Sequence, residues 1–203
     1  MTKKIAVIDY KVGNIRSVIE AFSIFDLDIS YTSCYNNIMR SDAIVLPGVG
    51  SYSYGANNLK KLGLDDTIKE YAEKSKPIMG ICLGMQLLMN ESEEFGNTKG
   101  LGLIDGKVKS LSNYTKHSVP HIGWEEVMFK NNFFQRDDFF FCHSYIAILE
   151  NQQNMLATAK CKDYTFCAAA RKDNIIGLQF HPEKSSKSGI KLIEKFIDMI
   201  KDS

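Results

Sequence analysis

The chain has 203 residues, of which 44% are hydrophobic and 24% charged, and its net charge is +1. This length suits one α/β domain, expected over residues 1–203, and so balanced a charge gives no reason to expect nucleic acid or an anionic membrane as a partner. The five cysteines show neither a CxxC pair nor a metal-binding spacing with histidine, and neither a signal peptide nor an apolar run near the ~20 residues of a membrane helix is visible, so a cytoplasmic protein is expected.

The first half alternates predicted strands with predicted helices. Short, continuous apolar runs are typical of strands buried on both faces of a parallel sheet; they are residues 5–8, 43–46 and 77–81. Apolar residues at helical spacing predict helices over 15–22, over 56–74 with a break at Gly63, and over 83–90. This alternation predicts a central, mostly parallel sheet with helices on both faces.

The second half has a different pattern. Strand-like runs with short connections indicate antiparallel additions to the sheet; they are residues 139–145, 155–159, 165–170 and 175–180. A last helix is expected to carry one apolar face, made of Ile193, Phe196, Ile197 and Ile200. Because no linker rich in Gly, Ser or Pro divides the halves, the prediction is one domain with an α/β fold.

Cys82 is the candidate nucleophile. It is the central residue of Gly-Ile-Cys-Leu-Gly, where a predicted strand turns into a predicted helix, which is the G-x-nucleophile-x-G arrangement of a nucleophile elbow. Such a tight turn needs small flanking residues, and the amides at the start of a helix favour a thiolate and bind a developing oxyanion. An isolated cysteine is more often a buried core residue, but the flanking glycines reverse that expectation for Cys82.

His181 is the candidate base, and Glu183 is the acid expected to orient it. His181 follows a strongly apolar predicted strand, where an imidazole can face a crevice shared with Cys82. Glu183 is two residues away and can hold the imidazole in one tautomer, as the carboxylate of a catalytic triad does, while Pro182 stiffens the link between them.

The other three histidines are weaker candidates. His143 is the rival base, although no carboxylate lies near it in the sequence. His117 is expected in a loop because Ser and Lys surround it, and His121 is expected in a turn because it follows Pro120.

Three segments together resemble a known family: Pro-Gly-Val-Gly at 47–50, Gly-Ile-Cys-Leu-Gly-Met-Gln at 80–86 and Gln-Phe-His-Pro-Glu-Lys-Ser at 179–185. In this order and spacing, the chain resembles the class I, or triad, glutamine amidotransferases. Pro-His-Ile-Gly-Trp at 120–124 and His-Ser-Tyr at 143–145 make it similar to one branch, the glutaminase subunits of imidazole glycerol phosphate synthases. The likeness covers nearly the whole chain.

The resemblance implies a glutaminase with a Cys-His-Glu triad. Cys82 would attack the carboxamide of glutamine to form a thioester, His181 would pass a proton to ammonia and then activate water, and Glu183 would orient His181. The amides of Val49 and Leu83 would bind the oxyanion, in many members only after a peptide flip near Val49, so that an isolated subunit is nearly inactive. Positions that match glutamine-binding residues are Gly50, Gln86, Glu94, Ser144 and Tyr145. No metal or organic cofactor is implied.

The resemblance also implies a partner, because the chain carries no nucleotide-binding motif with which to activate an acceptor. The expected partner is a synthase (cyclase) subunit with a (β/α)8 barrel. It would form a heterodimer with the glutaminase, receive ammonia through a channel, and make imidazole glycerol phosphate and AICAR in histidine biosynthesis. Lys184 matches the ammonia gate of this interface, and Trp124 and Phe140 match positions at the interface.

The chain departs from this branch at three positions. Glu125 stands where Asn is usual, Phe140 where Tyr is usual, and Lys11 where Gly is frequent. The first two positions belong to the face that meets the synthase in the family. An alternative is therefore a paralogous glutaminase that supplies ammonia for amidination or amidation of a surface-polysaccharide sugar. More distant alternatives are an inactive regulatory module, against which the complete triad argues, and a cysteine protease or thioesterase, against which Gln86 and the His-Pro-Glu segment argue.

Overall fold

The structure, a computed structural model, describes residues 2–200, and its largest element is a nine-stranded mixed sheet. The strands follow one another in the order β2-β1-β3-β4-β13-β12-β11-β8-β9. Their bounds are β1 Lys3–Ile8, β2 Leu27–Thr32, β3 Ala43–Leu46, β4 Ile78–Ile81, β8 His121–Phe129, β9 Asp137–His143, β11 Met155–Cys161, β12 Tyr164–Lys172 and β13 Ile175–Leu178.

The sheet has a parallel half and an antiparallel half that meet at β13. Strands β2, β1, β3, β4 and β13 pair in parallel, whereas β13, β12, β11, β8 and β9 pair antiparallel. The apolar runs of β3 and β4 are wholly buried, as expected for strands covered on both faces. The structure confirms the predicted α/β fold, with a parallel core and antiparallel strands from the second half of the chain.

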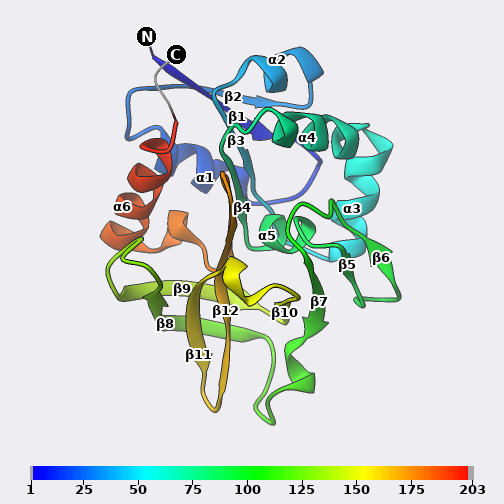
Figure 1. The fold of residues 1–203 in the computed structure, drawn as a ribbon, viewed down its shortest axis with the longest axis vertical. Coiled ribbons are helices and arrows are strands. Elements are labelled where there is room, and N and C mark those ends of the chain that lie inside the picture. Colours follow the sequence, from blue (N-terminus) through cyan, green and yellow to red (C-terminus); the bar gives the residue numbers. More distant parts are fainter. Residues whose placement is uncertain (1, 201–203) are drawn as a thin grey trace.

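Helices cover both faces of the parallel half (Figure 1). One face carries α1 (Ile15–Phe22) and α6 (Ser186–Ile197), which meet through the edge-to-face rings of Phe22 and Phe196. The other carries α3 (Tyr52–Lys61), α4 (Leu64–Glu73) and the short α5 (Leu83–Leu87), with α2 (Tyr35–Arg40) beside α4. Each face therefore has its own apolar core, and within residues 2–200 no helix is long and apolar enough to cross a membrane.

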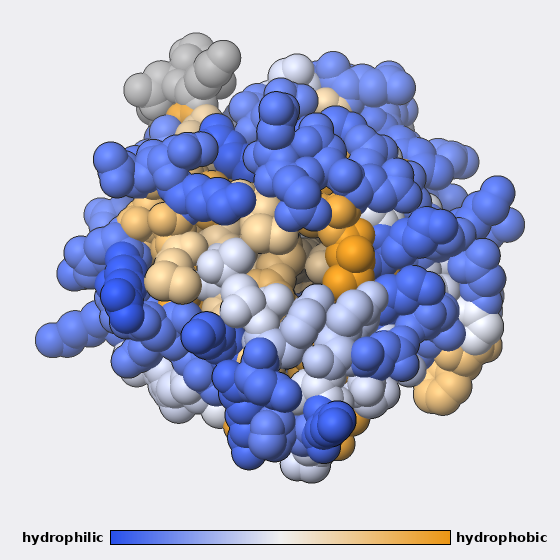
Figure 2. Space-filling model, turned by 60° about the horizontal axis from the view of Figure 1, so that its bottom comes forward, coloured by the Kyte–Doolittle hydropathy of each residue, from blue (hydrophilic) through white to orange (hydrophobic). Residues whose placement is uncertain are grey.

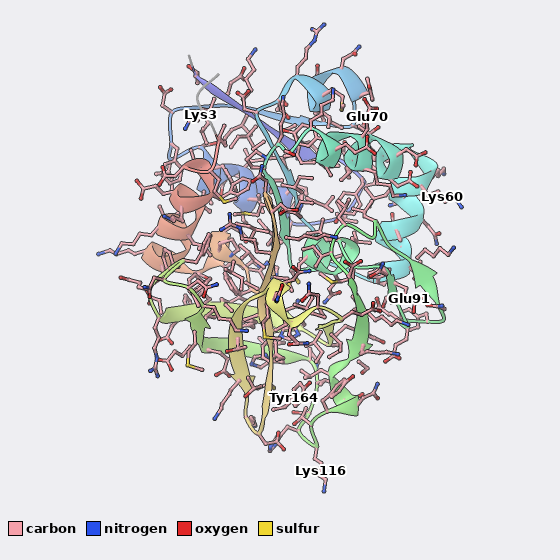
Figure 3. All side chains as sticks on the ribbon, viewed as in Figure 1. Lys3, Lys60, Glu70, Glu91, Lys116 and Tyr164 are labelled. Atoms are coloured by element: carbon pink, nitrogen blue, oxygen red, sulfur yellow. The ribbon has the colours of Figure 1, made fainter. Side chains whose placement is uncertain are left out.

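A second sheet of four strands lies beside α5 and α3, in the order β10-β7-β5-β6 (Figure 1). Its strands are β10 Tyr145–Leu149, β7 Gly106–Ser110, β5 Glu91–Ser92 and β6 Thr98–Lys99, and the 3-10 turns are η1 Leu111–Asn113, η2 Gln152–Asn154 and η3 Pro182–Lys184. Near the turn of the β11–β12 hairpin, Tyr164 stacks on Tyr114 with ring centroids 5.0 Å apart, which ties the end of the main sheet to the segment after η1 (Figure 3).

Several predicted elements have different bounds in the structure. The helix expected over 56–74 begins earlier, at Tyr52, and breaks as predicted at Gly63, whose φ of 66° suits glycine. The helix expected over 83–90 ends at Leu87, because the amides of Leu88 and Met89 bond to carbonyls only three residues back and tighten the turn.

Two further predictions were wrong because of the way the strands pair. The run 139–145 is two strands in different sheets, separated at Ser144, whose carbonyl accepts a hydrogen bond from the amide of Leu111 at 2.8 Å. His121 does not lie in a turn but begins β8, where it pairs with His143 of β9. The antiparallel partner strand, which is remote in sequence, extends the backbone at His121.

Candidate active site

Cys82 follows β4 directly and has a backbone conformation that is rare for any residue but glycine, with φ 53° and ψ −106°. Its amide donates to the carbonyl of Leu178 at 2.7 Å, which ties it to the carboxyl end of β13. Both flanking glycines are required by close packing. A Cβ on Gly84 would lie 1.7 Å from the carbonyl oxygen of Leu46, and one on Gly80 would lie 2.7 Å from that of Gly84. The strained elbow therefore depends on these two residues.

The helix after Cys82 was expected to stabilise a thiolate, but the structure indicates a different source of positive charge. Helix α5 has only five residues, so its dipole is small and the expected help from a long helix is limited. The Cys82 side chain instead interacts with the imidazole of His181 and helps to raise the pKa of that imidazole. An imidazolium beside a cysteine favours the thiolate form.

His181 and Glu183 form a buried pair. The Nδ1 of His181 lies 2.8 Å from Oε1 of Glu183, and the two side chains are only 2% and 1% exposed. Burial alone would lower the pKa of His181, but hydrogen bonds to Cys82 and Glu183 outweigh burial and raise the pKa to about 10. The ring is therefore an imidazolium at neutral pH, and its Nδ1–H is donated to Glu183.

The loop that carries His181 is clamped to β9. The amide of His181 donates to the carbonyl of Phe140 at 2.9 Å, and the amide of Phe140 donates to the hydroxyl of Ser185 at 3.0 Å. The same hydroxyl donates to the carbonyl of His181 at 2.6 Å. These bonds hold η3 and the imidazole in one position relative to the sheet.

His143, the rival base, is not free to serve Cys82. Its Nδ1 lies 3.0 Å from the carbonyl oxygen of Tyr145 and its Nε2 lies 3.1 Å from Nδ1 of His121. Burial, with a smaller effect of His121, lowers the pKa of His143 to about 3. His143 is therefore a neutral, fully bonded group in the wall of the site, and His117 is exposed in a loop, as predicted.

A cleft of about 260 Å³ opens beside Cys82. Its lining includes every residue that the sequence predicted for glutamine binding or for the oxyanion, namely Val49, Gly50, Leu83, Gln86, Glu94, Ser144 and Tyr145. A larger cavity of about 490 Å³ lies between α3, α4 and β6 and is lined by none of them. Lys60, which lines this second cavity, projects from the outer side of α3 (Figure 3).

The two predicted oxyanion donors are not both available. The amide of Leu83 donates to the carbonyl of Gly48 at 3.3 Å, so this carbonyl occupies the place where an oxyanion would bind. Gly50 has a φ of 119°, a conformation that favours glycine, and it follows Val49 in the same loop. The hydroxyl of Tyr10 donates to the carbonyl of Pro47 and anchors the start of this loop.

Gln179 is a site residue that the sequence analysis missed. It is fully buried, its Nε2 lies 3.9 Å from Sγ of Cys82, and its Oε1 accepts a hydrogen bond from Nε2 of Gln86 at 3.1 Å. A polar residue inside an otherwise apolar run, two positions before His181, is the signal that could have found it.

Asn14 is a second residue near the triad that the sequence analysis did not predict. Among residues 2–200, its Nδ2 and the Oε2 of Glu183 are both buried without a hydrogen-bond partner, and both residues line the same small void. A donor and an acceptor thus face one void behind the carboxylate of Glu183.

The three predicted interface residues lie together on one side of the β8–β9 pair. Trp124 and Phe140 are opposite each other in register, with ring centroids 6.0 Å apart, and Nζ of Lys184 lies 5.9 Å from the Phe140 ring. Glu125 points to the opposite side of β8, toward His121. Its place in the sequence beside Trp124 therefore does not put its side chain on the same surface.

The arrangement of the strands agrees with comparisons with known proteins. A family model described as Glutamine amidotransferase class-I matches residues 6–199, so the chain belongs to this family of enzymes. Imidazole glycerol phosphate synthase subunit HisH 2 from Methanococcus maripaludis is 42% identical over 200 residues, which cover 95% of this chain and 98% of the relative. Imidazole glycerol phosphate synthase subunit HisH 1 from Legionella pneumophila is 36% identical, over 96% of this chain and 99% of the relative.

A solved structure shows the same fold at lower identity. The structure of PurLQS from Thermotoga maritima matches with a TM-score of 0.77 and 21% identity, over 99% of this chain and all of that one (100%). At this identity the likeness concerns the fold alone.

Proposed function

We propose that this chain is the glutaminase subunit of imidazole glycerol phosphate synthase, and that it hydrolyses glutamine to glutamate and ammonia for a synthase subunit in histidine biosynthesis. The main support is the assembly of Cys82, His181 and Glu183 beside a cleft lined by all the residues expected to bind glutamine. Relatives with this name, 36% and 42% identical over nearly their whole length, support the particular pathway.

The chemistry follows from the positions of the three side chains. The Cys82 thiolate attacks the carboxamide carbon of glutamine, and the C–N bond breaks as His181 gives its proton to the nitrogen, so that ammonia leaves a thioester. Neutral His181 then takes a proton from water, whose oxygen attacks the thioester carbon. The C–S bond breaks, glutamate leaves and the thiolate is restored. Glu183 keeps Nδ1–H of His181 bonded throughout.

The oxyanion would be bound by the amides of Leu83 and Val49. Leu83 now donates to the carbonyl of Gly48. Turning the peptide between Gly48 and Val49 would remove this carbonyl and bring the Val49 amide to the same place, so two donors would face the oxyanion. We therefore expect low activity of the free chain and activation when the partner favours the turned peptide.

Substrate glutamine would bind along the cleft. Gln86 uses both hydrogens of Nε2 on the carbonyl of Tyr145 and on Gln179, which leaves its carbonyl oxygen for a ligand donor. Glu94 is the single carboxylate among the described residues that line the cleft, and it suits the α-ammonium group of glutamine. Gly50 and Ser144 would complete the walls.

The partner would be a synthase subunit with a (β/α)8 barrel, bound as a heterodimer in the cytoplasm. Trp124, Phe140 and Lys184 form the surface that would meet it, with Lys184 at the gate through which ammonia crosses. All 203 residues would form one glutaminase domain, and its chemistry calls for no cofactor.

The test is turnover of the assembled enzyme after Cys82→Ala. With glutamine as the nitrogen source, we expect turnover to fall by at least about 10³-fold, because the nucleophile is gone. With ammonium salts, turnover should stay at the wild-type level, because the synthase is untouched. Cys34→Ala, at an exposed cysteine just before α2, is the matched control and should change neither.

The pathway is tested separately by glutaminase assays of the wild-type chain with and without the barrel synthase and its nucleotide ligand. Strong stimulation is expected. A Cys82→Ala enzyme that still uses glutamine would refute the nucleophile. Activity that the synthase leaves unchanged would refute the histidine pathway and favour the sugar-modifying paralogue.

A further inference from the structure

A line of polar contacts outside the triad begins at Glu125, on the inner side of β8. Its Oε1 lies 3.1 Å from Nε2 of His121, and Nδ1 of His121 lies 3.1 Å from Nε2 of His143. Nδ1 of His143 lies 3.0 Å from the carbonyl oxygen of Tyr145. The two histidines are opposite each other in the register of β8 and β9, and both are buried. Four residues from three strands thus form one continuous hydrogen-bonded row.

The far end of this row reaches the nucleophile. The carbonyl oxygen of Tyr145 also accepts from Nε2 of Gln86 at 3.0 Å, and the same Nε2 donates to Oε1 of Gln179 at 3.1 Å. Nε2 of Gln179 lies 3.9 Å from Sγ of Cys82. A change in the row at Tyr145 would therefore reach the amide that faces the sulfur.

If every contact in the row is a hydrogen bond, the row needs one proton more than two neutral imidazoles and a carboxylate provide. The carbonyl of Tyr145 can only accept, so Nδ1 of His143 carries a hydrogen. Burial, with a smaller effect of His121, lowers the pKa of His143 to about 3, so it is neutral and its Nε2 accepts from Nδ1–H of His121. A neutral His121 would then turn a bare Nε2 toward the carboxylate of Glu125, two acceptors 3.1 Å apart.

The additional proton belongs on His121. A carboxylic acid ordinarily loses its proton at lower pH than an imidazolium does, and a third of the Glu125 side chain is exposed to water, which favours its ionised form. The titratable groups in reach are Glu125 and the neutral His143, with the thiol of Cys161 near Glu125. The rings of Phe141 and Phe166 cover His121 at centroid distances of 5.6 and 5.9 Å.

We propose that Glu125 is a positioning residue that holds His121 as an imidazolium, and that this charged pair fixes the row from β8 through Tyr145 and Gln86 to the amide of Gln179 beside Cys82. The inference rests on the proposed glutaminase function for its kinetic consequence, but not for the position of the proton. Positions that orient a reacting group through another residue alter rate more than binding, because the substrate does not touch them.

The test is Glu125→Gln, which keeps the shape but can donate from its amide to a neutral His121, so the row survives without the additional proton. ¹⁵N NMR of the histidine side chains at pH 7.5 should show both ring nitrogens of His121 protonated in the wild type, and only Nδ1 in the variant. Signals are assigned with His121→Gln. This readout does not need activity, so it is independent of the proposed function.

Kinetics of the complex with the barrel synthase give the second readout. We expect Glu125→Gln to lower kcat with glutamine about tenfold, to leave KM for glutamine within twofold, and to leave ammonia-dependent turnover unchanged. The matched control is Glu70→Gln on α4, whose carboxylate accepts from the Tyr35 hydroxyl at 2.8 Å, far from the cleft (Figure 3). A neutral His121 in the wild type, or a Glu125→Gln enzyme with wild-type kcat, would overturn the proposal.

Discussion

Burial gives His143 an unusual protonation. Its imidazole is buried and neutral, with a pKa of about 3, whereas an unfolded histidine titrates near 6.5. Between these values the unfolded chain binds a proton that the folded chain does not. Folding stability is therefore complete above about pH 6.5 and is lost as the pH falls toward 3, by about 1.4 kcal/mol per pH unit from this residue.

We predict that His143→Gln weakens this acid dependence. Glutamine cannot take up the proton, yet its amide can still donate to the carbonyl of Tyr145. Urea unfolding from pH 7 to pH 4 should show a shallower loss of unfolding free energy than in the wild type. His117→Gln, at an exposed histidine, serves as the control. If both variants lose stability as steeply as the wild type, His143 is not the buried neutral group described above.

The roles of single residues could be predicted where the residues that act together lie close in the sequence. The elbow around Cys82 and the pair His181 and Glu183 each lie within a short segment, so their spacing alone indicates how they meet. Gln179 and Glu125 could not be recognised in this way. Gln179 contacts Gln86 of α5 and Cys82 after β4, which the position of β13 beside β4 brings close. Glu125 contacts His121 of its own strand, and only the register of β8 on β9 links that pair to His143.

At the scale of elements, the contact between α5 and the parallel strands is the closest in the site. A Cβ on Gly84 would lie 1.7 Å from the carbonyl oxygen of Leu46 at the end of β3. A backbone oxygen in a buried strand cannot move away as a flexible side chain can. The helix would have to shift, and the elbow with it.

Gly84→Ala is therefore expected to destabilise the fold by about 3 kcal/mol or more, the upper end of the usual cost of overpacking. For a chain of this size such a loss lowers Tm by about 6–12 °C, measurable by thermal unfolding followed by circular dichroism. Gly13→Ala is the control, because its Cβ would meet only the Val49 side chain, at 3.4 Å. Equal melting temperatures for wild type and Gly84→Ala would contradict the close packing.

The elements that could be predicted are those with both faces buried. Strands β1, β3 and β4 appear in the sequence as short, continuous apolar runs, which are typical of strands with both faces buried. Strand β2 was missed because it is an edge strand with polar residues at Asp28 and Ser30, half-exposed along its length. The four-stranded sheet was missed because β5 and β6 have two residues each, too few for any periodicity.

At the scale of the whole molecule, one side of β8 is unusually apolar for a surface. Ile122, Trp124 and Met128 alternate along the strand and are 61%, 50% and 43% exposed. Figure 2, with the end that carries the antiparallel strands turned forward, shows apolar surface around a central hollow and hydrophilic residues around it. An apolar centre with a polar rim is typical of a protein interface.

We predict that Trp124→Ala weakens binding of the proposed synthase subunit about thirtyfold, which corresponds to about 2 kcal/mol and is the usual effect at an aromatic anchor. Isothermal titration calorimetry would measure it. Alkylation of Cys82 by iodoacetamide in the free chain should stay unchanged, because Trp124 does not touch the cleft. Ile24→Ala, an exposed apolar residue outside β8, is the control. An unchanged affinity would show that Trp124 is not part of the interface.

The position of β13 has a consequence for the order in which the enzyme is made. β13 is the last strand among residues 2–200, yet it inserts between β4 and β12 in the middle of the sheet. During translation, Cys82 is therefore synthesised long before His181, and a nascent chain carries the thiol without the imidazole. Any chain that stops before β13 would leave two open strand edges, which invite aggregation and proteolysis. A chain made as far as Cys82 but not as far as His181 therefore lacks the imidazole that the proposed reaction needs.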